Sequence, residues 1–124
     1  MTTAARYRAA CAALGLPVWR PGMRAVAARP EPLEPVCSRA PDDLRGWTPY
    51  PGAEPDFADP ATIGVLLAAV REAWASPTLF VRPTASGWTV MRGRGMGKLS
   101  DGETEADALI AALEAAAARR GCRL

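Results

Sequence analysis

The clearest hydrophobic pattern in the chain lies between residues 56 and 74. Apolar side chains recur there with the spacing of a helix that buries one face, at Ile63, Leu66, Leu67, Val70 and Trp74. Just before this stripe, the Asp59 carboxylate can accept hydrogen bonds from the first helical turn, and Pro60 suits the first helical position. The pattern therefore predicts a central helix, capped by Asp59, that supplies part of the core.

A second stretch with helical spacing ends the chain. Thr104 is a suitable N-cap and is followed three residues later by Asp107, much as in a capping box. Arginines near the end favour the negative C-terminal end of the helix dipole, and Gly121 can end the helix. The buried face is predicted to consist of Ala106, Leu109, Ile110, Leu113 and Ala117.

A shorter helix is predicted at the N-terminus. Thr3 is its expected cap, and Gly15, followed by Leu16 and Pro17, is its expected end. Its apolar positions are Tyr7, Ala10, Cys11 and Leu14. Because isolated helices of about a dozen residues are marginal in water, this helix must pack on another element, and a sheet is the simplest candidate.

Residues 23–28 could form a short strand before the central helix, because the character of their side chains alternates. One face would carry Met23, Ala25 and Ala27. From Arg29 to Pro55 the chain is rich in proline, which removes backbone donors and argues against a central strand. Only residues 35–39 have strand character there, and an edge strand or a surface segment is expected. We therefore expect residues 29–55 to be a mostly irregular segment that wraps on the core.

A hairpin is predicted after the central helix. Residues 78–82 and 88–92 have strand character, and residues 83–87 have the composition of a turn. Leu79 and Val81 can share one face of the first strand, while the turn length leaves the pairing register open.

In chain order, these elements are a helix, weak strands, a helix, a hairpin and a helix. This order favours an α+β domain in which a small antiparallel sheet packs with three helices. A chain of 124 residues with 49% hydrophobic and 23% charged residues lies in the ordinary globular range, and about two thirds of its unfolded surface can be buried. We therefore expect a single domain over residues 1–124.

Charge and cysteine content limit the partners and the cellular compartment that are expected for the protein. The formal net charge of +2 does not by itself demand nucleic acid or an anionic membrane as a partner. No apolar run approaches the roughly 20 residues that span a bilayer, so no membrane association is expected. Three cysteines lie far apart, at Cys11, Cys37 and Cys122. Free thiols in a reducing cytoplasm fit this pattern.

Enzyme chemistry has little support in the sequence. The chain contains no histidine, which removes Ser-His and Cys-His nucleophile pairs and the usual structural zinc sets. Asp42 with Asp43 and Asp56 with Asp59 are the nearest approach to paired catalytic carboxylates, but Asp59 is already assigned to a helix cap. We predict no enzyme activity, no catalytic residue, no cofactor and no metal site.

The segment from Gly93 to Gly102 is predicted to be a glycine-rich, basic loop. It fails as a phosphate-binding P-loop, because one residue too few precedes its Gly-Lys pair and no Ser or Thr follows that pair. Arg92, Arg94 and Lys98 could instead form a flexible cationic finger that meets phosphates or an acidic protein surface. The alternative is a solvated exit from the hairpin with no binding role.

Aromatic residues of the proline-rich segment are the other candidate contacts. Trp47, Tyr50 and Phe57 are too many aromatics for a disordered linker, so this segment is expected to press onto the core. Trp47 is nevertheless more open than the tryptophans on the predicted core faces. The candidate partner-binding residues are therefore Arg92, Arg94, Lys98, Trp47 and Tyr50.

Three stretches resemble small phage and prophage proteins of the phage ABA sandwich type. They are DFADPATIGVLLAAVREAW at residues 56–74, GWTV at residues 87–90 and TEADALIAALEAA at residues 104–116. The resemblance covers about half of the chain, from Asp56 onward. It implies an α/β/α sandwich from a phage or prophage and supplies no catalytic or ligand-binding residue. The proline-rich segment and the basic loop are departures from that pattern.

Together these observations favour a small non-enzymatic protein-binding module of a phage or mobile element, acting in the cytoplasm of a bacterial host. Inhibition of a bacterial antiviral defence system is one role of this kind. Two alternatives stay open at this point. The first is nucleic-acid binding through the loop from Arg92 to Lys98, and the second is a structural virion protein.

Overall fold

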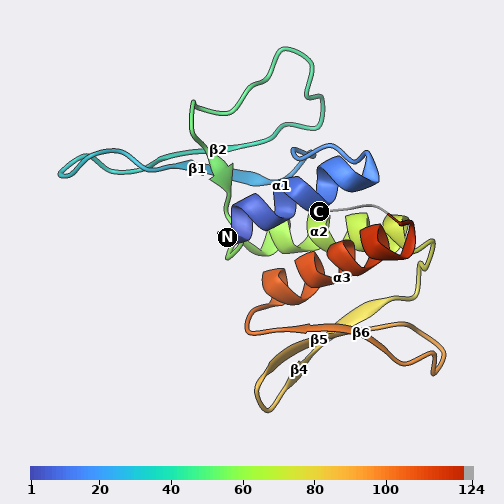
Figure 1. The fold of residues 1–124 in the computed structure, drawn as a ribbon. Coiled ribbons are helices and arrows are strands. Elements are labelled where there is room, and N and C mark those ends of the chain that lie inside the picture. The colour runs from blue at the N-terminus through green and yellow to red at the C-terminus, as the bar shows by residue number, and fades with distance from the viewer. Residues whose placement is uncertain (122–124) are drawn as a thin grey trace. The chain divides into compact units, whose positions relative to one another are not determined.

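The computed structural model describes residues 1–121 of the chain, and these residues form three helices and two small antiparallel sheets. The α+β class expected from the sequence is confirmed (Figure 1). The elements in chain order are α1 (Thr3–Leu14), β1 (Arg24–Ala27), β2 (Val36–Arg39), β3 (Glu54–Pro55), α2 (Pro60–Ala73), β4 (Phe80–Thr84), β5 (Gly87–Met91), β6 (Lys98–Gly102) and α3 (Glu105–Arg119).

The chain divides into two compact units. Unit 1 consists of Met1–Val18 and Leu66–Leu124 and contains α1, α3 and the strands β4 to β6. Unit 2 is Trp19–Val65 and contains the strands β1 to β3. Helix α2 begins in unit 2 and ends in unit 1. The expectation of a single domain over residues 1–124 stays a prediction.

The strands form two sheets where the sequence pattern indicated one. In unit 2 the strand order is β2-β1-β3, and in unit 1 it is β4-β5-β6. Each strand pairs within its own unit, and among the described residues no strand pairs across α2. A common sheet would require the chain to return past the central helix.

The sheet β4-β5-β6 corrects the expected hairpin in two respects. Thr84 pairs with Gly87, so the turn is residues 85–86 rather than residues 83–87. Pro83 lies within β4, which an edge strand tolerates because its outward side needs no ladder donor. Residues 98–102 were expected to be loop but form β6, which pairs with β5 through a register shift at Met91.

Helix α3 packs on the sheet of unit 1 and supplies more of the unit's buried residues than any other element does. Its N-cap is Thr104, as predicted, whose hydroxyl accepts a hydrogen bond from Asp107 N at 3.1 Å. The sheet approaches the helix closely: a Cβ atom at Gly102 would collide with the backbone at Ala108, and Ser100 Oγ donates to Ala108 O at 2.8 Å. The predicted stripe is fully buried, at Ala106, Leu109, Ile110, Leu113 and Ala117.

Helix α1 begins one residue earlier than its predicted cap implies. Thr2, not Thr3, is the N-cap, because Thr2 has an extended backbone and its hydroxyl accepts from Ala5 N at 3.1 Å. The predicted end is confirmed, since Gly15 adopts the left-handed conformation with φ 68°. The predicted apolar face is buried at Tyr7, Ala10, Cys11 and Leu14.

Packing of α1 onto α3 supplies the partner that a short helix needs. Arg6 on α1 forms an ion pair with Glu114 on α3, with 2.5 Å between guanidinium nitrogen and carboxylate oxygen. The Tyr7 ring is buried, and its hydroxyl donates to Val18 O at 2.6 Å. The helix therefore packs on another helix rather than on a sheet.

Helix α2 confirms the most prominent pattern in the sequence. The Asp59 carboxylate caps it by accepting from Thr62 N at 3.0 Å. Of the five predicted stripe residues, Leu66 and Val70 are fully buried, whereas Ile63, Leu67 and Trp74 are half-buried. Two residues outside that stripe, Thr62 and Ala69, are also buried.

Unit 2 has a small core on one face of its sheet. Ala25, Ala27 and Ala53 are buried there, and Trp19, Val36 and Trp47 pack against them. Strand β1 alternates as predicted, with Met23, Ala25 and Ala27 facing inward. Strand β2 lies at the edge of the sheet, in agreement with the edge-strand expectation for residues 35–39. Residues 29–35 are exposed throughout.

Candidate functional site

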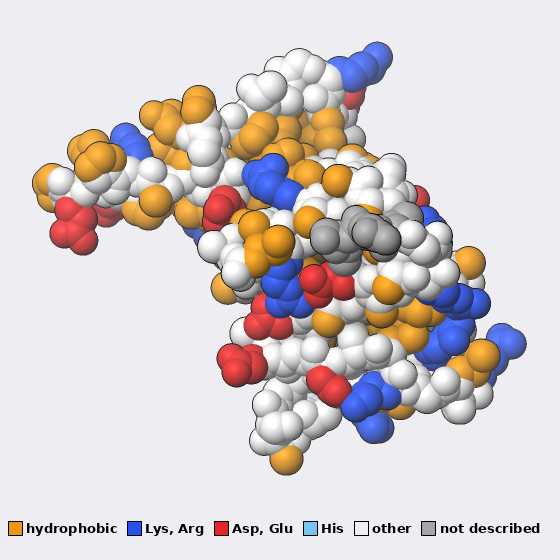
Figure 2. Space-filling view, viewed as in Figure 1, with side chains coloured by type: hydrophobic (Ala, Val, Ile, Leu, Met, Phe, Trp, Pro, Cys, Tyr) orange, Lys and Arg blue, Asp and Glu red, His pale blue; other side chains and the backbone are white. Residues whose placement is uncertain are grey.

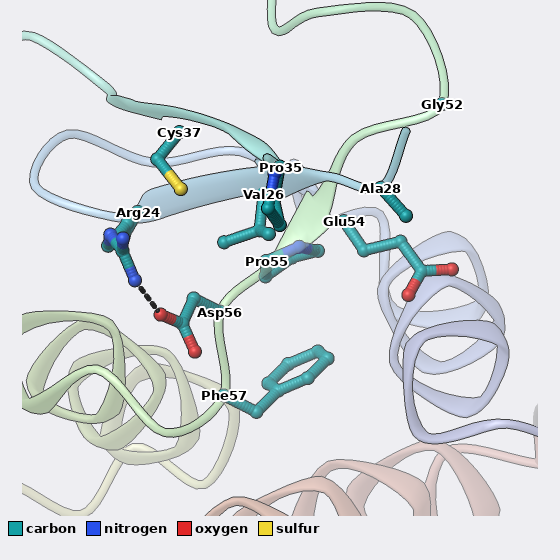
Figure 3. Close-up of a pocket in the computed structure, with 10 residues that line it drawn as sticks. All are labelled: Arg24, Val26, Ala28, Pro35, Cys37, Gly52, Glu54, Pro55, Asp56 and Phe57. Atoms are coloured by element: carbon teal, nitrogen blue, oxygen red, sulfur yellow. Dashed lines mark hydrogen bonds and ion pairs between the residues drawn. The ribbon is translucent and has the colours of Figure 1, made fainter. Parts of the chain in front are cut away.

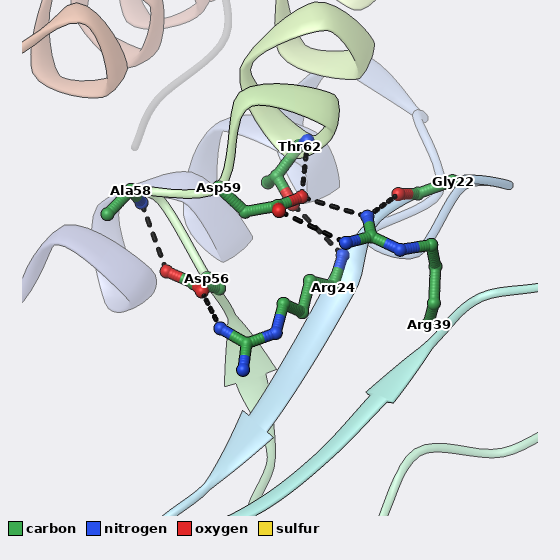
Figure 4. A network of polar contacts seen from close by, with 7 residues as sticks. All are labelled: Gly22, Arg24, Arg39, Asp56, Ala58, Asp59 and Thr62. Atoms are coloured by element: carbon green, nitrogen blue, oxygen red, sulfur yellow. Dashed lines mark hydrogen bonds and ion pairs between the residues drawn. The ribbon is translucent and has the colours of Figure 1, made fainter.

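A network of polar contacts ties the strands of unit 2 to the start of α2 (Figure 4). The Asp59 carboxylate receives two hydrogen bonds from the Arg39 guanidinium, at 2.9 and 3.1 Å, and one from the Thr62 hydroxyl at 3.1 Å. Arg39 also donates to Gly22 O at 2.7 Å. The hydrogen bonds from Arg39, followed by those from Thr62, hold the pKa of Asp59 far below its ordinary range.

A second carboxylate of the network positions β1 against β3. Arg24 forms an ion pair with Asp56 at 2.5 Å, and the other oxygen of Asp56 accepts from Ala58 N at 3.1 Å. The backbone N–H of Arg24 donates to the Thr62 hydroxyl at 2.9 Å. The hydrogen bond to Asp56 raises the pKa of Arg24. The network therefore fixes the wall of the hollow that lies beside it.

That hollow, called the sheet pocket below, lies on the face of the β2-β1-β3 sheet that points away from the alanine core (Figure 3). It is open to solvent and has a volume of about 570 Å³. Its lining combines apolar side chains with one ion pair and one further carboxylate, and consists of Arg24, Val26, Ala28, Pro35, Cys37, Gly52, Glu54, Pro55, Asp56 and Phe57.

The lining has a definite polarity. Val26 forms the centre of its floor, and the Arg24–Asp56 pair occupies one side of it. Glu54 makes no ion pair within residues 1–121, so the net charge of the lining is negative. Cys37 is exposed and has a free thiol. The pocket can thus receive an apolar group next to a cationic one.

The sheet pocket borders an open sheet edge. Ala40 N donates to Met23 O at 2.8 Å, and hydrogen-bonded pairs alternate along an antiparallel ladder. The N–H and C=O groups of Cys37 and Arg39 therefore point away from β1, toward the free side of β2. A free edge of this kind can pair with another extended chain.

The basic residues predicted to form a cationic finger do not form one group. Lys98 lies at the start of β6 and is paired with Asp101 at 2.7 Å. This pair, together with a hydrogen bond from Thr89, lowers the pKa of Asp101. Arg94 is exposed and has φ 60° in the connection between β5 and β6. Arg92 instead places its guanidinium over the Trp74 ring, 5.2 Å from the centroid.

The two predicted aromatic contacts belong to unit 2. Trp47 is half-buried and meets Trp19 edge to face, with 5.8 Å between ring centroids. This arrangement matches the expectation that the proline-rich segment presses an aromatic side chain onto the core. Tyr50 is 49% exposed and lies in the loop before β3. Neither residue lines the sheet pocket.

A group of arginines around Trp74, called the Trp74 arginine cluster below, was not predicted as a unit. Arg92 and Arg119 lie over the indole at 5.2 and 5.3 Å from its centroid, and Arg71 and Arg120 bind carbonyl groups of the same region. Figure 2 shows Lys and Arg side chains gathered near the C-terminal ends of α2 and α3. The helix-end position of Arg119 and Arg120 was visible in the sequence, but their meeting with Arg92 was not.

Within residues 1–121, no group of three Cys, Asp or Glu side chains is arranged to hold a metal ion. None of the helices in this range has the length and apolar character needed to cross a membrane. Cys122 lies outside the described residues. No protein-family model, curated protein or solved structure matches the chain.

Proposed function

We propose that this protein is a small non-enzymatic module that binds a partner protein through the sheet pocket. The observation that supports this proposal is the position of the pocket beside the free edge of β2. Small-molecule sites usually enclose most of their ligand, whereas this hollow is open to solvent. An open hollow beside a free strand edge fits an extended peptide segment, which would add as a fourth strand.

The partner segment has a defined chemistry in this proposal. Its backbone pairs with the outward groups of Cys37 and Arg39, and every second side chain faces the sheet pocket. An aliphatic side chain of the segment faces the apolar part of the lining, and a Lys or Arg side chain suits the net negative charge of the lining. The occupant is therefore an extended segment with an apolar and a basic residue two positions apart.

The biological setting is a narrower part of the proposal. It rests on the sequence resemblance to phage ABA sandwich proteins, which suggests a phage or prophage protein acting in the cytoplasm of a bacterial host. A module without catalytic groups can act there by occupying a surface that its target needs. Inhibition of a bacterial antiviral defence system is the role we propose for such binding.

The test is affinity capture from bacterial lysate with three forms of the full chain. Wild-type protein is compared with Val26→Arg, which places a cation on the pocket floor, and with Arg45→Gln, an exposed control in the same unit. We expect a stoichiometric partner with wild type and the control, and at least about a tenfold loss with Val26→Arg, as for a central interface residue.

Two further measurements complete this test. A Cys37→Pro variant removes an outward N–H without touching the β1 ladder, and it should weaken capture while circular dichroism stays unchanged. Expression of the wild type, but not of Val26→Arg, should alter phage infection of the host. Capture of the same partner by all variants, or of none by wild type, contradicts binding through this pocket.

A further inference from the structure

We infer that the Trp74 arginine cluster binds the phosphodiester backbone of duplex DNA, independently of base sequence. The cluster belongs to unit 1, whereas the sheet pocket belongs to unit 2, so the inference goes beyond the proposed function. The inference is based on the arrangement of four guanidinium groups. Two of them lie over one indole ring, and two others lie at the adjoining helix ends.

Trp74 holds the cluster in place. Its indole N–H donates to Ala112 O at 2.9 Å, which ties the end of α2 to α3 and fixes the ring. Arg92 and Arg119 lie over that ring at 5.2 and 5.3 Å from the centroid. Cation–π contacts orient a guanidinium without using its N–H donors. Within residues 1–121 neither guanidinium donates a hydrogen bond, so the N–H groups of both remain available to bind a ligand.

Two more arginines are anchored beside them. Arg71 Nε donates to Leu79 O at 2.8 Å, and an Arg120 terminal nitrogen donates to Ala73 O at 3.0 Å. A guanidinium carries five N–H donors, so each keeps several after this bond. The anchoring bonds limit the movement of both side chains, which lowers the entropy lost on binding an anion.

Charges in unit 1 are segregated along α3. Glu105 and Asp107 lie in its first turn, whereas Arg119 lies in its last. A helix of this length spans about 22 Å, more than two Debye lengths at physiological salt. The carboxylate nearest in sequence to the cluster is Glu72, next to Arg71 on α2. The cluster therefore brings four arginines together next to this one carboxylate, although the whole chain has a charge of only +2.

Duplex DNA suits this arrangement better than an acidic peptide. It carries about one negative charge per 1.7 Å of axis, so several phosphates can meet closely spaced guanidinium groups together. Planar guanidinium groups bind phosphate oxygens in pairs. Because arginines already cover the indole, base stacking on Trp74 is disfavoured, and contacts fall on phosphates.

The test is fluorescence anisotropy of a labelled 20-base-pair duplex titrated with the full chain at about 50 and 200 mM salt. For roughly three phosphate contacts, the logarithm of the association constant falls with a slope of about −3 against the logarithm of salt. Arg119→Gln should reduce that slope by about 0.9, and Arg119→Lys, which retains the charge, should leave it nearly unchanged. Arg45→Gln removes one charge from the other unit and should leave the slope as in wild type.

Thermal melting of each variant shows whether the fold is kept. Arg119 is exposed and its guanidinium donates no hydrogen bond within the described residues, so its substitution should shift melting little. The inference is overturned if wild type does not bind at low salt, or if Arg119→Gln and Arg45→Gln have the same slope. It is also overturned if a glutamate-rich peptide of equal charge competes as well as unlabelled duplex, which would point to an acidic protein surface.

Discussion

At the scale of single residues, Asp59 connects two elements of unit 2 through its hydrogen bonds. Its carboxylate caps α2 through Thr62, and it also receives the Arg39 guanidinium from β2. One side chain thus joins a helix start to an edge strand 20 residues earlier in the chain. The ion pair with Arg39 depends on Asp59 remaining ionised, whereas the cap needs only an accepting oxygen.

A pH dependence follows from this residue. The folded state lowers the pKa of Asp59, so an unfolded chain takes up its proton first as the pH falls below about 4, the ordinary range of aspartate. We expect the free energy of unfolding to be highest above that range and to fall with pH below it. In Asp59→Asn, which keeps a capping oxygen, the fall should be shallower.

Urea unfolding of both proteins between pH 7 and pH 3 measures the two slopes. Asp43 and Asp101 also have lowered pKa values, so some acid sensitivity should persist in the variant. Equal slopes for wild type and Asp59→Asn would contradict the assignment of this linkage to Asp59.

At the scale of elements, β6 and α3 approach each other closely at one glycine. Gly102 of β6 faces the first turns of α3, where a Cβ atom would meet the backbone at Ala108 and Asp107. Neither segment can move without disturbing the pairing of β6 with β5 or the cap at Thr104. Only glycine fits at this position, because no room is left for a Cβ atom.

Gly102→Ala and Gly64→Ala make a matched pair of variants. The first should lower the free energy of unfolding by about 1–3 kcal/mol, as overpacking does. The second adds the same methyl group within α2, where nothing lies within 4 Å, and should raise it by about 0.5–1 kcal/mol. Denaturant unfolding of both variants and wild type measures the signs. A neutral Gly102→Ala would show that β6 does not lie this close to α3.

The elements that the sequence predicts well are those specified by local chemistry. The caps at Asp59 and Thr104 and the helix end at Gly15 depend on residues a few positions apart, and all three are confirmed. Strand β6 was missed because its residues, KLSDG, have low strand propensity, and pairing with β5 overrides that preference. The hairpin turn was misplaced because Pro83 is typical of turns but also fits an edge strand.

The candidate sites were harder to predict for the same reason. Arg92, Arg94 and Lys98 are neighbours in sequence, but Arg92 contacts Trp74 while Lys98 pairs with Asp101. The contact between Trp74 and Arg119 joins residues 45 positions apart, and no local pattern encodes it. Likewise, the sheet pocket depends on how the β2-β1-β3 sheet pairs and which of its faces stays uncovered.

At the scale of the whole molecule, the two proposed surfaces belong to different units. Their substitutions should therefore act independently, because sites without shared partners usually behave additively. Val26→Arg should abolish partner capture and leave the DNA salt slope unchanged, and Arg119→Gln should do the reverse. Measuring both properties for the two single variants and the double variant tests this separation. Loss of both properties in either single variant would contradict it.

The exposed thiol of Cys37 makes the sheet pocket directly observable. Cys11, by contrast, is only 2% exposed and should react slowly with alkylating dyes. In a Cys122→Ser background, a maleimide fluorophore would attach on β2 at the rim of the pocket, next to the strand edge. Its emission should then change when a peptide segment binds in the sheet pocket. Cys37 is therefore an attachment point for a fluorescent reporter of pocket occupancy. This reporter can be used before the partner is identified.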